Sequence, residues 1–511
     1  MAIGQPATLD PVLASQPAER VIVSAIFDAL VGYQATTANV VPGVALSWTI
    51  TGHNTVFTFH LQSGTRFSDG EPVTAQSFVR GMTRALSPSL SNAPGSLSGE
   101  LDEIVGAAAV TDGTATTLAG AVAVNATTLQ IRLSAPDAEF LLRCGDGPFM
   151  PIPKTSAMEA RNPSWAADPL GNGPFELATP PPGGWLSASQ VVLVPNPDYA
   201  GAPPKVAQAV LKVIPDVSAA EKAWMDGQVD WAPIPPTATA QVEALGKKSF
   251  LDDPLGLVDY LAVETGSLAA GSDPEALREA ISLAINRGVI AGQLYDGAAS
   301  VARGFVPPVV PGSASAPGAG PGPCPDCDFQ PQQARQLLAQ SGISVTGAVQ
   351  LVFPAGAGED AVMAAVAQDL QQNLGIDAVP TPVPAIGVGA GAGETGAVGA
   401  SGLRIVGVSQ VMDYPGADDF LSSLISTSSG AVLSADAQSA LGDALAAARA
   451  VASPAQRATA YANAERLVMQ DLPVIPLVWP KGVVLARLSH WSFLTMNPFG
   501  EPSLRTVTPK G

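Results

Sequence analysis

The sequence predicts an α/β fold, and three observations support this class. Residues 56–86 read as a β-strand, a tight turn and a capped helix in succession. Residues 191–194 and 209–214 are short apolar runs rich in β-branched side chains, as in strands. Residues 332–341 and 436–450 have the pattern of amphipathic helices. Because strands alternate with helices along the chain, the sequence is typical of α/β proteins.

The strand–turn–helix segment is the clearest of these signals. Residues 56–61 (VFTFHL) combine aromatic and β-branched side chains and have glycines on both flanks, which favours a strand. An Asp-Gly pair at positions 69 and 70 signals a tight turn. Thr74 is a suitable N-cap for a helix over residues 75–86, whose apolar positions recur at helical spacing. None of these residues carries catalytic chemistry, so the segment predicts structure.

The composition excludes several classes of function. The 511 residues allow two or three domains and a large core. The 25 basic and 44 acidic residues give a formal net charge of −19, which disfavours binding to nucleic acid and to anionic membranes. Only three cysteines and three histidines are present, too few to suggest a metal cage or histidine catalysis. The sequence therefore predicts no metal site and no cofactor.

Neither a membrane span nor a signal peptide is visible in the sequence. No apolar run approaches the roughly 20 residues that cross a bilayer. The chain opens Met1-Ala2-Ile3-Gly4, without the basic and apolar segments of an export signal. We expect that the natural protein carries an export signal and that Met1 stands in its place here.

Three motifs in the first 80 residues carry a resemblance to a known family. Residues 42–48 read PGVALSW, residues 57–62 read FTFHLQ and residues 67–77 read FSDGEPVTAQS. This run closely resembles the extracytoplasmic solute-binding proteins of peptide and nickel ABC importers. The departures are Gln62 for the usual Arg and Ser77 for the usual Asp, both interpreted as surface changes.

The resemblance continues in order along nearly the whole chain. Residues 8–11 (TLDP) and 26–31 (IFDALV) look like the family's N-terminal strand and helix. Further matches are GNGPF at 171–175, NPDY at 196–199, DGQVD at 226–230, LREAISLAINR at 277–287 and PVIPL at 473–477.

The resemblance implies a two-lobed fold, like that of periplasmic binding proteins, with a hinge and an extra inserted subdomain. The first lobe is expected to be discontinuous and to use residues 1–40, 145–252 and 477–511. The inserted subdomain is expected over residues 41–144, and the second lobe over residues 253–476.

The segment that most clearly suggests a binding function is residues 410–420, which read QVMDYPGADDF. It resembles the family loop in which peptide-binding members receive the ligand's α-ammonium on an Asp, here Asp413, followed by Tyr414. A charge-assisted hydrogen bond to a partly buried carboxylate is chemically suited to that task. Gln410, Val411 and Met412 would offer backbone groups to an extended peptide. The alternative is that Asp413 only caps a turn.

Other candidate ligand-binding residues follow from the same resemblance. Gln410 stands where the family has Trp, which makes an apolar wall polar and puts the usual side-chain pocket in question. Arg404 and Arg303 are candidates for a ligand carboxylate, with surface solvation as the alternative for both. Asp28 matches an acidic first-lobe position that faces the cleft. Trp479 could form an aromatic wall, with core packing as the alternative.

The cysteines are interpreted as structural. Cys324 and Cys327 match C-x-x-C, but a Pro/Gly-rich loop precedes them where a redox enzyme would have a strand, and no further ligand for zinc lies nearby in sequence. In an exported protein this spacing favours a local disulfide. Cys144 would then be a buried free thiol.

Two further patterns predict no chemistry. Residues 391–396 (GAGETG) match the dinucleotide fingerprint, but prolines precede them and a strand, residues 403–408, follows, so we interpret them as a surface loop. Residues 307–323 and 384–402 are low-complexity segments and predict loops. No Gly-x-Ser-x-Gly elbow is present, and a hydrolase is the weakest alternative, although triad partners can be distant in sequence.

The sequence therefore predicts a binding protein and not an enzyme. The expected function is to capture short peptides between two lobes and to deliver them to the permease subunits of an ABC importer. We expect an extracytoplasmic monomer, lipid-anchored in its natural form. The alternatives are a non-peptide ligand on the same fold, such as a sugar, a metal chelate or haem, and a non-transport scaffold or regulator of the cell envelope.

Overall fold

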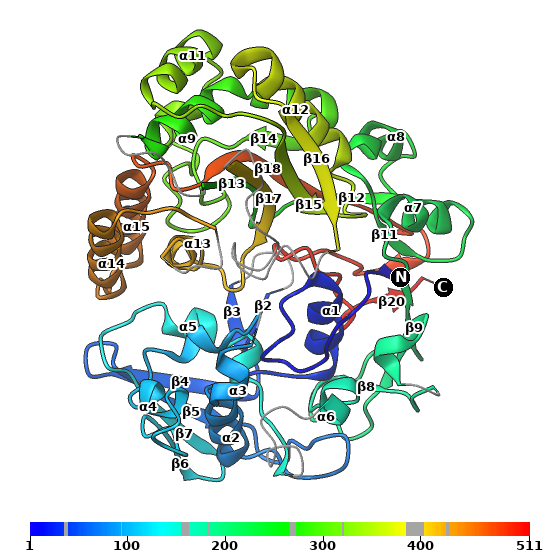
Figure 1. Cartoon of the computed structure of the whole chain (residues 1–511). Helices are drawn as coiled ribbons and strands as arrows, with labels where there is room; N and C mark the ends of the chain where they lie inside the picture. The colour runs from blue at the N-terminus through cyan, green and yellow to red at the C-terminus, as the bar shows by residue number, and fades with distance from the viewer. Residues whose placement is uncertain are drawn as a thin grey trace.

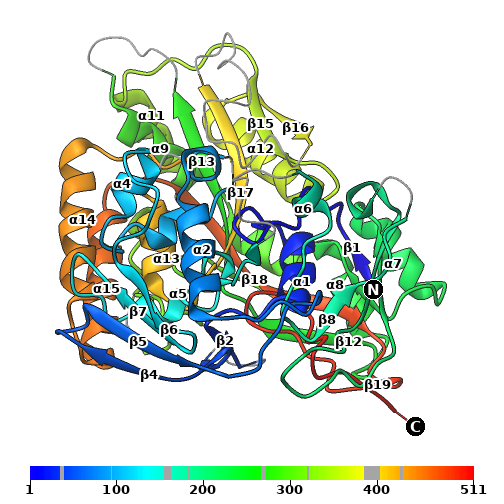
Figure 2. The same ribbon diagram turned by 90° about the horizontal axis from the view of Figure 1, so that it is seen from below.

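The computed structural model describes residues 1–34, 39–93, 95–154, 163–181, 184–265, 272–318, 321–384, 403–425 and 430–510. The chain forms two lobes that meet along a junction across the middle of the molecule (Figure 1). Seen from below, strands β4–β7 lie on the left, strands β1 and β8 lie on the right, and helix α1 runs between them (Figure 2).

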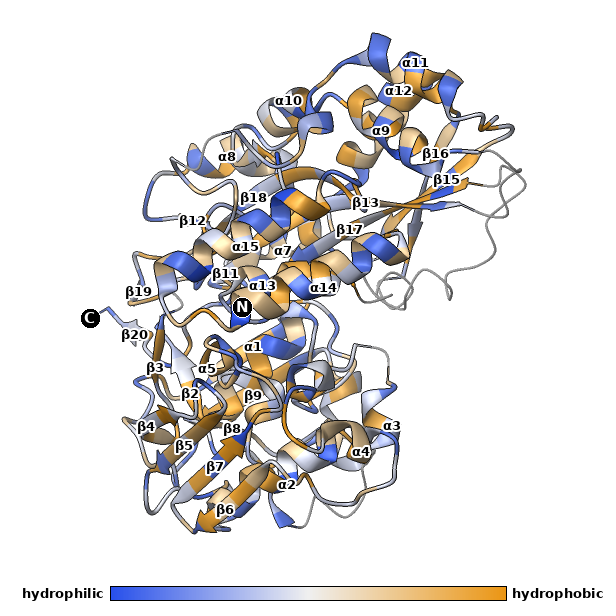
Figure 3. Cartoon of the chain, turned by 90° about the vertical axis from the view of Figure 1, so that its left-hand side faces the viewer, coloured by the Kyte–Doolittle hydropathy of each residue, from blue (hydrophilic) through white to orange (hydrophobic). Residues whose placement is uncertain are grey.

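The predicted strand–turn–helix segment is confirmed and belongs to an antiparallel sheet of order β4-β5-β7-β6. Its strands are Ala45–Thr51, Val56–Leu61, Thr128–Arg132 and Ala121–Asn125, in that order. Phe57, Phe59 and Leu61 are buried on one face of β5, and His60 is exposed on the other face. Figure 3 shows the apolar residues that run along these strands.

Helix α2 (Ala75–Ala85) packs on this sheet and begins where the sequence predicts. Thr74 is its N-cap and forms a reciprocal capping box with Ser77. Ser77 is fully buried, so its interpretation as a surface change is wrong: its hydroxyl accepts from the Thr74 amide at 3.2 Å and from Arg80 at 3.1 Å. A Ser here satisfies an amide that the first turn of a helix would leave unpaired.

The N-terminal elements lie elsewhere than the resemblance suggested. The strand is β1 (Ala2–Ile3) and not residues 8–11, and the helix is α1 (Pro17–Ile26) and not residues 26–31. Residues 8–10 are irregular and lead into a turn at residues 11–13, where the Leu13 amide donates to the Asp10 carbonyl at 2.9 Å; the buried Asp10 carboxylate accepts from the Val12 amide and pairs with buried Arg84. Pro17 suits the first turn of α1, and Phe27 ends it in an extended conformation.

The GNGPF motif explains why α1 ends at Ile26. A Cβ atom on Gly171 would lie 1.8 Å from the Ile26 carbonyl oxygen, and one on Gly173 would lie 2.6 Å from the Ile26 carbonyl carbon. Only glycine allows this close approach of two backbones. The Gly173 amide donates to the Ile26 carbonyl at 2.8 Å and thereby satisfies this acceptor at the end of the helix. Strand β8 (Phe175–Leu177) follows at once and joins β9 (Gln190–Pro195), β10 (Ala209–Val213) and β1 in one sheet.

The second large sheet has the order β11-β18-β13-β17-β15-β16, with β12 and β14 also paired to β18. Its strands are β11 (Trp231–Pro233), β12 (Phe250–Pro254), β13 (Leu257–Thr265), β14 (Ala299–Val301), β15 (Val349–Pro354), β16 (Ala378–Val383), β17 (Leu403–Val411) and β18 (Ile475–Ala486). Helices α9 (Pro274–Ala284), α11 (Pro331–Gln340) and α12 (Asp360–Leu374) lie above this sheet in Figure 1.

The remaining elements are short strands and helices. They are β2 (Val31–Tyr33), β3 (Val40–Pro42), β19 (Trp491–Ser492), β20 (Thr508–Pro509), α3 (Pro88–Ser91), α4 (Ala107–Thr111), α5 (Phe140–Arg143), α6 (Pro163–Ala167), α7 (Val217–Met225), α8 (Thr239–Glu243), α9 (Pro274–Ala284), α10 (Arg287–Val289), α11 (Pro331–Gln340), α12 (Asp360–Leu374), α13 (Ala417–Ser423), α14 (Ala435–Arg449) and α15 (Pro454–Val468). Within the described ranges, none of the helices is both long and apolar enough to cross a membrane.

Strand β18 changes partners part of the way along its length. Residues 475–480 pair with β13 and β14, and residues 481–486 pair with β12 and β11. The boundary expected between residues 476 and 477 therefore falls inside β18, a few residues before the change. Strand β18 therefore passes without a break from one packed region to the next. The residue boundaries of the two lobes and of the inserted subdomain stay a prediction.

The predicted disulfide joins Cys324 to Cys327. Arg287, which is 1% exposed, donates to the Cys327 carbonyl at 3.1 Å, and the Ser282 hydroxyl donates to the Asp326 carbonyl at 2.7 Å. Cys144 is a free and fully buried cysteine, as expected. The bridge therefore belongs to a short structural loop fixed to α9 and α10.

The first low-complexity segment forms a loop, and most of the second lies outside the described residues. The described part of residues 307–323 contains no helix or strand, as predicted. Glu465 of α15 fastens the chain around it, because its carboxylate accepts from the amides of Phe305, Val306 and Ala314 at 2.7–2.9 Å. Residues 385–402, which include the GAGETG pattern, lie outside the described residues.

Candidate functional site

Asp413 lies between the end of β17 and the start of α13, at the junction of the two lobes. The preceding residue, Met412, is buried, and its amide donates to Gly256 at 2.8 Å. The Asp413 amide donates to the carboxylate of Asp419 at 2.8 Å, which fixes the turn into α13. The backbone of the turn is therefore held from both sides, and the Asp413 side chain is left for other contacts.

The Asp413 carboxylate pairs with Arg20 of α1. Arg20 Nη1 lies 2.7 Å from Asp413 Oδ1, and this contact joins the N-terminal helix to the second lobe. Arg20 also contacts Glu501 at 3.1 Å and Asp146 at 4.0 Å. Its guanidinium lies 5.4 Å from the ring centre of Phe499. Sequence reasoning missed Arg20, because no local pattern links it to a residue 393 positions away.

Carboxylates gather around this ion pair. Burial raises the pKa of Asp413 to about 6, an effect that Arg20 opposes and Asp146 reinforces. Burial, together with Asp146 and Asp413, raises the pKa of Glu100 well above its usual range. The Asp413 side chain is 34% exposed, whereas that of Arg20 is 11% exposed. The geometry therefore leaves a partly accessible carboxylate in a strongly acidic part of the lobe junction.

Strand β17 has one edge that is only partly occupied. It pairs antiparallel with β13 along its whole length, from Leu403 to Val411. On its other side, β15 pairs only with residues 404–406. From Gly407 to Val411 this second edge has no strand partner among the described residues. Unpaired N–H and C=O groups of this kind can accept an additional extended chain.

Gln410 and Val411 lie on this edge and are partly buried. The Gln410 side-chain oxygen accepts a hydrogen bond from the Ser423 hydroxyl of α13 at 3.2 Å. The polar side chain that stands in place of the family's Trp is thus oriented by a neighbour. The structure places Gln410, Val411, Met412 and Asp413 in one continuous stretch.

Tyr414 points into a buried ion network between the lobes. Its hydroxyl donates to Asp418 at 2.9 Å, and the Arg143 guanidinium lies 5.3 Å from its ring centre. Arg143 of α5 pairs with Asp418 at 3.0 Å, and Arg449 of α14 pairs with the same carboxylate at 2.9 Å. Arg449 also contacts Glu103 at 2.6 Å. Helix α13, which carries Asp418, faces α5 across the junction in Figure 1.

Asp28 lies at a different place on the first lobe. Asn172 holds its backbone with two hydrogen bonds of 3.0 Å, one to the amide and one to the carbonyl. Its carboxylate pairs with Arg505, which also donates to the Tyr199 hydroxyl at 2.7 Å. Asp28 is therefore tied to the C-terminal segment in this structure.

Arg404 and Arg303 both have carboxylate partners within the second lobe. Arg404, 1% exposed, pairs with Glu264 of β13. It lies at the far end of β17, about 23 Å from Val411 at roughly 3.3 Å per residue. Arg303 pairs with Asp328 and is half exposed. The structure brings neither arginine close to Asp413.

Trp479 is buried in the core of the second lobe. It lies in β18, opposite Ser300 of β14, and is 7% exposed. Its indole nitrogen is buried and has no hydrogen-bond partner in the described part of the chain. The packing therefore accounts for most of the side chain, and its role as an aromatic wall stays a prediction.

A polar cluster that sequence reasoning missed lies beside the open edge of β17. The Ser409 hydroxyl lies 2.6 Å from Asp259 and 2.9 Å from Glu359, and the Tyr295 hydroxyl donates to Asp259 at 2.7 Å. One hydroxyl proton cannot serve both carboxylates, so a further proton is needed between them. Burial, reinforced by Asp259, raises the pKa of Glu359 to about 7. No short-range pattern in the sequence brings these residues together.

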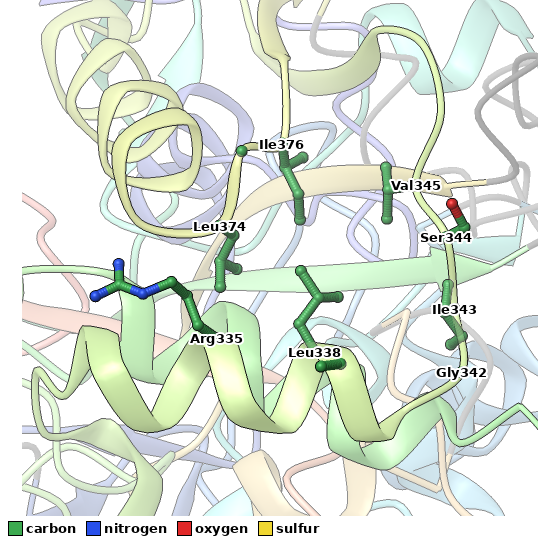
Figure 4. Close-up of a pocket in the computed structure, with 10 residues that line it drawn as sticks. Arg335, Leu338, Gly342, Ile343, Ser344, Val345, Leu374 and Ile376 are labelled. Atoms are coloured by element: carbon green, nitrogen blue, oxygen red, sulfur yellow. The ribbon is translucent and has the colours of Figure 1, made fainter.

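A cavity of about 520 Å³ lies far along the second lobe, between the ends of α11 and α12 (Figure 4). It is lined by Arg335 and Leu338 of α11, by Leu374 at the end of α12, and by Ile376 in the connection from α12 to β16. None of the predicted site residues lines this cavity. Within the described residues, no group of three His, Cys, Asp or Glu side chains is placed to hold a metal ion.

Comparison with known proteins identifies a family. Residues 39–431 match the bacterial extracellular solute-binding proteins, family 5 (middle). The chain is 28% identical over 484 residues to the periplasmic murein peptide-binding protein MppA of Escherichia coli K12, which is 93% of this chain and 86% of MppA.

Solved structures share the fold. The structure of E. coli murein tripeptide-binding protein MppA superposes with a TM-score of 0.84 at 24% identity and covers 99% of this chain and 97% of that one. The unliganded open form of MppA gives a TM-score of 0.68 at the same identity, with 99% of this chain and 96% of that one covered.

Two further structures agree over the whole length. OppA of Burkholderia pseudomallei gives a TM-score of 0.85 at 20% identity and covers 100% of this chain and 98% of that one. The ABC transporter-associated binding protein DppA of Helicobacter pylori, in complex with the peptide STSA, gives 0.80 at 20% identity with 100% and 97% covered. The chain belongs to the bacterial extracellular solute-binding proteins, family 5.

Proposed function

We propose that this protein captures short peptides between its two lobes and delivers them to the permease subunits of an ABC importer. The observation that carries the proposal is the open edge of β17 from Gly407 to Val411, which leads directly to Asp413. The edge offers backbone groups to an extended peptide, and the carboxylate offers an anion to its α-ammonium. The names of similar proteins, which include peptide-binding proteins, support the same function.

The length of the open edge suggests the size of the ligand. Five strand residues extend about 17 Å, which matches a peptide of about five residues at the same rise. Gln410 would present a polar side chain to such a ligand, and Met412 would contribute backbone contacts beside Asp413. Arg404 stays a prediction as a contact for the ligand carboxylate, because it is buried, pairs with Glu264 and lies on the part of β17 whose edge β15 occupies. Asp28 and Trp479 stay predictions as ligand contacts.

We further propose that the protein acts outside the cytoplasm as a monomer that is lipid-anchored in its natural form, and that it binds its ligand without transforming it. Membership of an extracellular solute-binding family supports the location and the role. A ligand that contacts both lobes would stabilise their closed arrangement, and the permease would recognise that arrangement.

The test is calorimetry on four combinations of protein and ligand. Wild type and Asp413→Asn are titrated with a mixture of tri- to pentapeptides, free or N-acetylated. A hydrogen-bonded charge pair typically costs roughly 2–5 kcal/mol when one partner is truncated. Either change alone should therefore weaken binding by well over tenfold.

The two changes together should weaken binding little more than either change alone, because both delete the same contact. Asp413→Ala is a further control, since it also removes the one side-chain oxygen that Asn retains. If acetylation leaves binding to the wild type unchanged, the α-ammonium is not recognised and the proposed role of Asp413 is wrong.

A further inference from the structure

The carboxylate proposed to receive the ligand's ammonium already contacts a cation of this chain. Arg20 Nη1 lies 2.7 Å from Asp413 Oδ1. Arg20 belongs to α1, whereas Asp413 follows β17, so the pair connects the two lobes. A guanidinium at this distance already satisfies one of the two carboxylate oxygens that an incoming ammonium could use.

Arg20 is held from several sides besides Asp413. Its Nε donates to Glu501 at 3.1 Å, and Asp146 lies 4.0 Å from Nη1. Phe499 lies against the guanidinium, and its own ring contacts that of Tyr33 at 5.1 Å between centres. Arg20 can therefore give up its contact with Asp413 and keep its place in the first lobe.

The two partners also differ in accessibility. The Arg20 side chain is 11% exposed, whereas the Asp413 side chain is 34% exposed. A ligand that enters the junction can therefore reach the carboxylate while the guanidinium stays covered. An ammonium bound there would lie within a few ångströms of the guanidinium, and two like charges this close repel each other.

We propose that Arg20 is a resident counter-ion of Asp413 that sets how strongly the protein selects ligands with a free α-ammonium. The inference rests on the proposed function. An incoming ammonium must share the carboxylate with Arg20 or displace it, so its net gain is smaller than at a carboxylate without a partner. Arg20 thereby lowers the penalty for ligands whose amino terminus is blocked and widens the range of ligands accepted.

The test measures selectivity and not affinity alone. Wild type, Arg20→Gln, Arg20→Lys and Arg457→Gln are each mixed at pH 8 with equal amounts of free and N-acetylated tri- to pentapeptides. The captured ligands are then counted by native mass spectrometry. Arg457 of α15 pairs at 3.0 Å with Glu139, which directly precedes α5, so this ion pair also crosses the junction. Arg457 serves as the matched control because it does not touch Asp413. Circular dichroism confirms that each variant is folded.

The expected result is a change in the ratio of captured free peptides to captured N-acetylated peptides. Arg20→Gln should raise the preference for free over acetylated peptides at least fivefold above that of the wild type. Arg20→Lys, which keeps the cation, and Arg457→Gln should stay within twofold of the wild type. An unchanged ratio in Arg20→Gln, with a clear preference in the wild type, overturns this inference and leaves the proposed function standing. If the wild type captures neither kind of peptide, the proposed function fails and the inference fails with it.

Discussion

Replacing Asp418 with Asn should destabilise the protein strongly, because Asp418 is the centre of the buried network between the lobes. Its side chain has no exposed surface, and it accepts from Arg143, Arg449 and Tyr414 at 2.9–3.0 Å. Although burial opposes ionisation, Arg143 and Arg449 hold the pKa of Asp418 below its ordinary value. The change to Asn keeps the shape of the side chain and removes the charge that both guanidinium groups need.

The magnitude follows from the burial. Breaking a buried ion pair by removing one partner costs about 3–5 kcal/mol. Asn keeps one acceptor oxygen, so a cost at the low end of this range, about 3 kcal/mol, is expected for Asp418→Asn. With an unfolding entropy of about 2.1 cal/mol/K per residue, 511 residues give about 1.1 kcal/mol/K, and Tm should fall by about 3 °C.

The assay is thermal unfolding by calorimetry at pH 7.5. The matched control is Asp226→Asn, which breaks an ion pair of similar length, 2.8 Å, between Lys222 and Asp226 on the surface of α7. Exposed pairs of this kind contribute about 0.3–0.5 kcal/mol, so Tm should change by less than about 0.5 °C. If Asp418→Asn unfolds within 1 °C of the wild type, or if the control loses as much, Asp418 is not the stabilising centre of this network.

Three further predictions concern other parts of the molecule. Burial raises the pKa of Asp137, Glu359 and Glu465 to about 7 each, so the folded state binds more protons than the unfolded state between about pH 4.5 and 7. Stability should therefore fall as pH rises through this window, and Tm should be higher at pH 5.5 than at pH 8; the opposite order would contradict these shifts. Glu465→Gln should lower Tm by about 2 °C, because its amide group faces a backbone donor where an oxygen accepts now; an unchanged Tm would show that the three amides find other partners. Thiol titration of the denatured, unreduced protein should find one free thiol, that of Cys144, and three thiols would exclude the disulfide.

Local signals predicted the elements that are determined by neighbouring residues. The strand at residues 56–61, the helix that begins after Thr74 and the disulfide between Cys324 and Cys327 all lie where the sequence indicates. In each case a turn, a cap or a short spacing carries the information. The N-terminal helix was misplaced because its end depends on the close approach of Gly171, which lies far away in the sequence.

The candidate site could be predicted only in part. The position of Asp413 after a strand follows from residues next to it, and so does the run of backbone groups before it. Arg20 could not be predicted, since its contact with Asp413 spans 393 positions and depends on how the lobes meet. The cluster of Ser409, Asp259 and Glu359 also depends on pairing between distant strands and on the position of α12.

Native mass spectrometry of the protein, purified without denaturation, would show whether the lobes hold peptides. The wild type should carry a set of bound masses that correspond to short peptides of about three to five residues. Asp413→Asn, purified in the same way, should retain far less of this material. A single non-peptide mass, or a wild-type protein that carries no ligand and takes up none of an added peptide mixture, would exclude peptide capture as the function.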